Sequence, residues 1–150
     1  MSRQQMICFV TPGALALPGD RLGRAVHALC ERIGRVHFAT LALLPPAPEA
    51  PHTEPPALLF EVVLDEDLLP ADFIDLMLAQ AFTTVWRLYR ANWPGPPGAD
   101  RATRRAWLRA FLIEHASVAD GGFVGARDHS VAQARAEQQL FRGARDLVQD

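Results

Sequence analysis

Three side chains in two apolar runs have the chemistry of an acid–base site. His37 lies at the start of VHFATLALL (residues 36–44), and Glu61 and Asp65 lie in ALLFEVVLD (residues 57–65). If the runs pair as an antiparallel hairpin, the start of one lies beside the end of the other, so we expect His37 to contact Asp65. A carboxylate beside an imidazole orients the ring and holds its charge, as in many acid–base sites. A structural hydrogen bond at the sheet margin is the alternative.

Glu61 is the polar exception in its run, because Leu59 and Val63 stand two residues to either side. A carboxylate on a covered sheet face has to be paired or functional. We therefore expect Glu61 either to face a cavity or to form a hydrogen bond or ion pair at an interface.

His115 falls on the apolar side of a helix expected at about 100–116, where it could reach a haem iron or a metal, or simply end the helix in the core. No two histidines have a ligand spacing such as H-x-x-x-H, and Cys8 and Cys30 have no metal-ligand spacing either. We predict no metal site built from protein ligands alone, and two reduced, buried thiols.

Arg101, Arg105 and Arg109 recur every four residues on the same helix. Like charges at this spacing repel by roughly 0.2–0.5 kcal/mol per pair, so we expect acidic groups of this chain or of a protein partner against them. A solvated helix face is the alternative. The net charge of −2 and the lack of an aromatic RNA-binding motif do not favour a nucleic-acid partner.

Both faces of the predicted hairpin are apolar. Strict alternation places Val36 and Phe38 on one face of the first strand, and Leu59 and Val63 on one face of the second. An antiparallel sheet with one wet face should alternate apolar with polar residues. We therefore expect the second face of the sheet to be buried as well, with Leu59 and Val63 as candidate partner-binding residues.

The remaining elements follow from periodicity and caps. We expect a strand at 4–11, helices at 20–34, 70–90 and 100–116, a short strand around 123–124, and a final helix from 130 to about 147. Without the extra helix at 100–116 and the C-terminal helix, the order is β-α-β-β-α-β. The predicted fold class is therefore α+β, a ferredoxin-like antiparallel sheet with helices on one face.

Length and composition predict one domain over residues 1–150, with an exposed proline-rich loop at 45–56. No apolar run reaches about 18 residues, and no signal peptide precedes the first strand. We expect a cytoplasmic protein without a membrane partner.

Several short motifs resemble a ferredoxin-like segment of uncharacterised bacterial proteins, some of them found in haem peroxidase or catalase contexts. They are His37-Phe38-Ala39, Leu58-Leu59-Phe60 ending in Asp65, Phe123-Val124-Gly125, and Ser130-Val131-Ala132-Gln133. The resemblance spans roughly residues 35–140. It departs at Asp65-Glu66, where such segments often carry Asp-Gly. The element order is also similar to that of the dimeric α+β barrel group, which includes small monooxygenases and haem enzymes.

The predicted function is a non-catalytic association module, a homodimer or accessory subunit acting through its sheet face, with no cofactor. The reason is that two helices can cover one face only, and soluble monomers seldom expose apolar patches beyond about 300–600 Å². Either the extra helix or the C-terminal helix could cover the second face instead. The alternative function, implied by the resemblance, is a dimeric α+β barrel enzyme that binds haem or a small organic substrate between the sheets.

Overall fold

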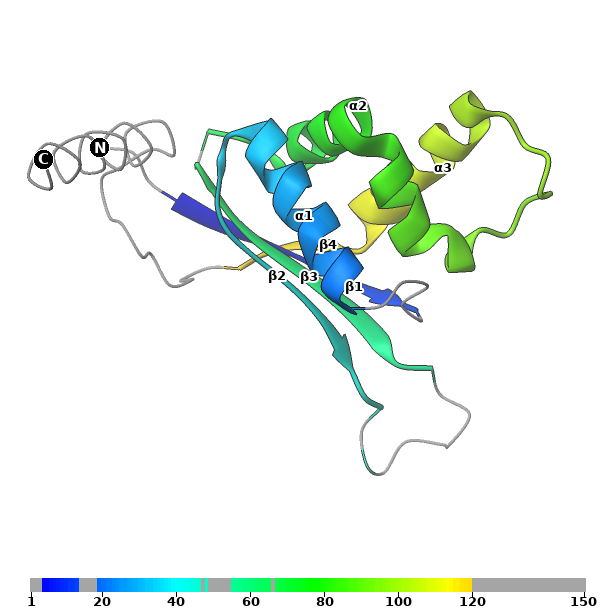
Figure 1. Cartoon of the computed structure of the whole chain (residues 1–150), viewed down its shortest axis with the longest axis horizontal. Helices are drawn as coiled ribbons and strands as arrows, with labels where there is room; N and C mark the ends of the chain where they lie inside the picture. Colours follow the sequence, from blue (N-terminus) through cyan, green and yellow to red (C-terminus); the bar gives the residue numbers. More distant parts are fainter. Residues whose placement is uncertain (1–3, 14–18, 47, 49–54, 66, 120–150) are drawn as a thin grey trace, which may run out of the picture.

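The two apolar runs pair as antiparallel strands, as their β-branched and aromatic residues predict. The computed structural model describes residues 4–13, 19–46, 48, 55–65 and 67–119. In this part of the chain the fold is α+β, with a four-stranded antiparallel sheet and three α-helices (Figure 1). The strands, in the order β2-β3-β1-β4 across the sheet, are β1 (Gln4–Pro12), β2 (Val36–Leu44), β3 (Ala57–Asp65) and β4 (Ala116–Ala119).

The helices begin and end where the local sequence predicts. They are α1 (Gly19–Ile33), α2 (Pro70–Tyr89), a 3₁₀ turn η1 (Arg90–Asn92) and α3 (Arg101–Glu114). Gly34, at φ 69°, ends α1 with its N–H donating to the carbonyl of Cys30. Pro70 occupies the first turn of α2, and Asp100 caps α3 by accepting a hydrogen bond from the backbone N–H of Thr103 at 2.6 Å.

The helices of the described part lie on one face of the sheet (Figure 1), and the core fills the space between. Alternate residues of β3 point into it, and the rings of Phe9 and Phe60 stack with centroids 5.8 Å apart. The fully buried side chains of the sheet and of α2 include Ile7, Phe9, Leu58, Phe60, Val62, Leu64, Phe73, Ile74 and Met77. Each aliphatic one contributes roughly 1.5–3 kcal/mol by leaving water.

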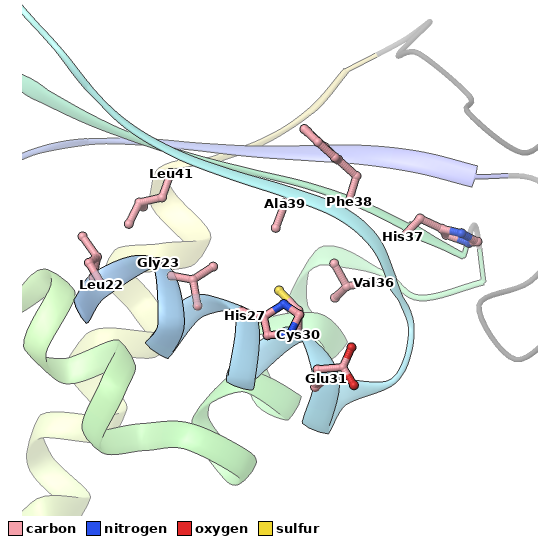
Figure 2. A pocket seen from close by; sticks show the side chains of 11 residues that line it. Leu22, Gly23, His27, Cys30, Glu31, Val36, His37, Phe38, Ala39 and Leu41 are labelled. Carbon is pink, nitrogen blue, oxygen red and sulfur yellow. The ribbon is translucent and has the colours of Figure 1, made fainter. Parts of the chain in front are cut away.

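A β-bulge interrupts β2. The pairing with β3 steps from Val36↔Leu64 directly to Phe38↔Val63, which leaves His37 as the extra residue. Val36 and Ala39 therefore both pack against the core, whereas Phe38 points away from α1 and is 57% exposed (Figure 2). The expectation from strict alternation, that Val36 and Phe38 share a face, was wrong because of this one inserted residue.

The extra helix α3 packs against α2, with Leu108 and Leu112 buried. It therefore does not cover the helix-free face of the sheet. It ends at Glu114, and Ala116, where a helix end was predicted, already begins β4. The strand expected around 123–124 and the C-terminal helix lie outside the described residues. Within the described part of the proline-rich loop, Pro45, Pro46, Pro48 and Pro55 are exposed and Pro56 is half-buried.

Candidate functional site

The structure brings His37 and Asp65 together. Nε2 of His37 lies 2.8 Å from Oδ1 of Asp65, and both side chains are nearly buried. The predicted cross-strand contact is therefore confirmed. The bulge contributes to it, because the inserted residue carries the imidazole past the register of Leu64 to the end of β3.

Gln4 completes the surroundings of the ring. It pairs with Asp65 in the β1–β3 register, and its Nε2 lies 3.4 Å from Nδ1 of His37. With the ring as the neutral Nε2–H tautomer, Gln4 donates to Nδ1 and Nε2 donates to the Asp65 carboxylate. Both ring nitrogens then have a partner within the chain, so the geometry favours the structural role of the pair over proton transfer to a substrate.

Arg35 binds the same carboxylate from the other side. Its Nε lies 3.7 Å from Oδ2 of Asp65, and its guanidinium also donates to Asp67. The hydrogen bond from Arg35 holds the pKa of Asp67 below its usual range. These contacts link the turn after α1 to the turn after β3. Neither the contact of Arg35 with Asp65 nor that of Gln4 with His37 was predicted from the sequence, although Arg35 stands two residues before His37.

Glu61 lies in a polar row that crosses the helix-free face of the sheet. Cross-strand pairing aligns it with Thr40 on β2 and Cys8 on β1, and Cys8 is aligned in turn with Ser117 on β4. Burial raises the pKa of the Cys8 thiol, and the nearby Glu61 carboxylate raises it further. Glu61 is half-buried, and the row concentrates polar groups in the middle of this face.

Apolar rows flank the polar row. One contains Phe38, Val63 and Met6, and the next contains Ala42, Leu59 and Val10. Val63 is only 6% exposed and Leu59 is half-buried, whereas Val10 is 46% exposed. The most exposed apolar side chains described on this face are thus Phe38, Val10 and Leu44, not the predicted Leu59 and Val63. Leu59 and Val63 lie where β3 is paired along both of its edges, whereas the register of β4 with β1 ends at Phe9, one residue before Val10.

His115 forms the C-cap of α3. Its Nδ1 donates to the carbonyl of Phe111 at 2.8 Å, and its ring lies against the ring of Phe111 with centroids 4.4 Å apart. It therefore occupies the helix-end position that was the alternative to a haem or metal ligand. Among the described residues, no group of three or more His, Cys, Asp or Glu side chains is placed to hold a metal ion.

The arginine stripe contacts α2 of the same chain. Arg109 forms a bidentate pair with Asp75, at 2.7 and 3.0 Å, and Arg101 lies over the ring of Phe82 at 4.9 Å. The hydrogen bond from Arg109, together with the charges of Arg109 and Arg105, holds the pKa of Asp75 below its usual range. The acidic group expected against the stripe is thus found within this chain for Arg109.

Comparison of the chain with protein-family models, with curated proteins and with solved structures found no match. In the described part of the chain, no helix is both long and apolar enough to span a membrane.

Proposed function

We propose that this chain is a ferredoxin-like association module that forms a homodimer through the helix-free face of its sheet. The chain order β1-α1-β2-β3-α2-β4, with α3 inserted before β4, supports the split βαβ arrangement. The strand order supports it too, because β1 and β3 are the inner strands and all neighbours are antiparallel.

The observation that carries the dimer is the accessibility of large apolar side chains on this face. Val10, Phe38 and Leu44 are all exposed, and by register they belong to the rows that the described helices do not cover. Removing each such side chain from water is worth roughly 1.5–3 kcal/mol. A second copy offers the same three side chains, and two sheets stack face to face about 10 Å apart.

The polar row sets a condition on this interface. Burying the Glu61 carboxylate between two sheets is costly unless it accepts hydrogen bonds. Thr40, which is aligned with Glu61 in the same row, carries a hydroxyl group that can donate to it from either copy, whereas the Ser117 hydroxyl already donates to the carbonyl of Cys8. We therefore expect a face-to-face dimer that is apolar along its margins and hydrogen-bonded along the Glu61 row.

Light scattering across the micromolar range tests the proposal. Val10→Glu puts two like charges into the interface and should weaken dimerisation by at least roughly tenfold. Leu69→Glu is the matched control, since Leu69 is exposed just before α2 and outside the sheet. A monomeric wild-type protein, or equal effects of the two variants, would contradict the proposal.

The second candidate function is an α+β barrel enzyme that binds a small organic substrate between two such sheets. The half-buried Glu61, beside Cys8 and Thr40, favours it, because a carboxylate held against a substrate can act as a general base. An absorption spectrum and native mass spectrum of freshly purified protein separate the two functions. A bound chromophore or small molecule that is lost in Glu61→Gln would support the enzyme.

A further inference from the structure

The Glu61 carboxylate stands apart from the other charged groups of the helix-free face. By register, the described strand residues on this face include two carboxylates, Glu61 and Asp65, and neither arginine nor lysine. Asp65 is bound by His37 and Arg35 at the end of the sheet. It is four residues from Glu61, about 13 Å along an extended strand. Within the described residues, no hydrogen bond or ion pair is made by the Glu61 side chain.

The neighbours of Glu61 do not supply a counter-charge. Cys8 is aligned with it on β1, and Thr40 is aligned with it on β2. Burial raises the pKa of the Cys8 thiol and the Glu61 charge raises it further, so the thiol is neutral below about pH 8. On β4, Ser117 lies in the same row, but its hydroxyl donates to the carbonyl of Cys8. The rows on either side are apolar, which leaves the Thr40 hydroxyl as the donor for Glu61 in the described part of the face.

A second copy of the chain does not remove this shortage of donors. In a two-fold interface each copy presents the same patch, so the second copy brings another Glu61 and another Thr40, and again no cation from this face. Each carboxylate has about four lone-pair sites, whereas each hydroxyl donates once. Burial and a nearby like charge both disfavour the ionised form of a carboxyl group. A carboxylic acid supplies a donor of its own and needs no counter-charge.

We propose that Glu61 takes up a proton when two copies pair, which makes the dimer a pH-sensitive assembly. The inference rests on the proposed function, because the second copy is what removes the carboxylate from water. The paired state then binds more protons than two separate copies, so association strengthens as pH falls and weakens as pH rises. One proton shared by two Glu61 side chains gives at most about a tenfold change in the dissociation constant per pH unit, and one proton per copy gives at most about a hundredfold change.

Sedimentation equilibrium of the full-length chain between pH 5 and pH 8, at constant ionic strength, tests this linkage. We expect the dissociation constant of the wild-type dimer to rise by at least roughly tenfold across the range. Glu61→Gln keeps the shape of the side chain and removes the charge. Its dissociation constant should not change with pH, and at pH 8 it should lie below that of the wild type.

Three control variants assign the slope to Glu61. His37→Gln removes the histidine at the end of this sheet, since histidine changes its charge in this pH range. Cys8→Ser removes the adjacent thiol. Glu114→Gln removes an exposed carboxyl group at the end of α3, outside the sheet. All three should retain the wild-type slope.

Proton release on dissociation is a second readout. Calorimetric dilution of the wild-type dimer, in two buffers that differ in ionisation enthalpy, counts the protons released. The other described histidines, His27 on α1 and His115 at the end of α3, lie outside the strands of this face. We therefore expect between one and two protons per wild-type dimer, and fewer than half as many for Glu61→Gln.

The linkage and the dimer can fail separately. A wild-type dimer whose dissociation constant does not rise with pH, or a slope that persists in Glu61→Gln, would overturn the proton uptake. Weakening of that same dimer by Val10→Glu would still support the proposed interface. A chain that is monomeric at every pH would contradict the proposed function, and the proton uptake with it.

Discussion

Asp65 is held at both of its carboxylate oxygens, by His37 at Oδ1 and by Arg35 at Oδ2. Gln4 forms a hydrogen bond with Nδ1, the second nitrogen of the His37 imidazole. A histidine that acts as a general base needs one nitrogen available to the substrate proton, and here both nitrogens face groups of the same chain. At the scale of single residues, this cluster fastens three strands and a turn together at one end of the sheet.

A structural role for the cluster predicts a loss of stability on substitution. Asp65→Asn removes the charge that Arg35 and His37 share, and it should lower the free energy of unfolding by about 1–3 kcal/mol. His37→Gln should cost about 0.5–1.5 kcal/mol for each of the ring's two hydrogen bonds that the glutamine does not replace. Urea denaturation measures both.

Glu114→Gln, which neutralises an exposed carboxyl group at the end of α3, is the control and should change stability by less than about 0.5 kcal/mol. If Asp65→Asn is as stable as the control, the cluster has no structural role and its assignment has to be revised.

At the scale of elements, the connection between α2 and α3 makes side-chain contacts with both helices. Trp93 in this connection meets Trp86 of α2 and Trp107 of α3 edge to face, with centroids 5.7 and 5.2 Å apart. Its indole N–H donates to the carbonyl of Pro96, and Arg104 donates to the carbonyl of Pro97. The connection at residues 93–98 therefore fixes how α3 packs on α2. Helix α3 then leads directly into β4.

Two glycines of this turn provide a matched test. A Cβ at Gly95 would overlap the indole ring of Trp93, whereas a Cβ at Gly98 meets nothing within 4 Å. Gly95→Ala should therefore displace the ring and lower the free energy of unfolding by about 1–3 kcal/mol, the usual cost of overpacking. Gly98→Ala should be neutral or slightly stabilising. Tryptophan fluorescence and urea denaturation report both effects. Equal stabilities of the two variants would show that the ring of Trp93 can move aside without loss of stability.

At the scale of the whole molecule, three carboxyl groups in separate places make stability depend on pH in the same direction. Hydrogen bonds from Arg35, from Arg109 and from Thr103 hold the pKa values of Asp67, Asp75 and Asp100 below their usual range. Groups with lowered pKa values bind fewer protons in the folded chain than in the unfolded chain. Their contribution is present above an unfolded pKa of about 3.9 and is lost as pH falls through the folded values.

We therefore expect the free energy of unfolding to decrease as pH falls below about 4. Arg109→Gln should remove the part of this decrease that belongs to Asp75, while lowering stability at neutral pH only slightly, as is usual for exposed ion pairs. Urea denaturation at a series of pH values measures the slope. The same slope in wild type and variant would show that the Asp75–Arg109 pair contributes nothing in solution.

The sequence by itself predicted the first three strands, the three α-helices and one contact between elements, but not β4 at Ala116–Ala119. Short runs rich in β-branched, leucine and aromatic residues predicted β1, β2 and β3. Apolar stripes with Pro70 and Asp100 at their starts predicted α2 and α3. These signals act within a few residues of chain. The contact of His37 with Asp65 was predicted from antiparallel geometry, since the start of one strand lies beside the end of its partner, although the bulge that completes it was not predicted. Glu61 was singled out because it broke an otherwise apolar pattern.

Only the tertiary structure decided which surfaces remain accessible. The bulge that separates Val36 from Phe38, the pairing that brings Gln4 of β1 beside Asp65, and the packing of α3 on α2 all depend on contacts between residues distant in sequence. No local pattern records them, because each is chosen by how side chains fill the space between the sheet and its helices. The same packing leaves Val10 exposed on the helix-free face of the sheet, and the proposed dimer interface depends on it.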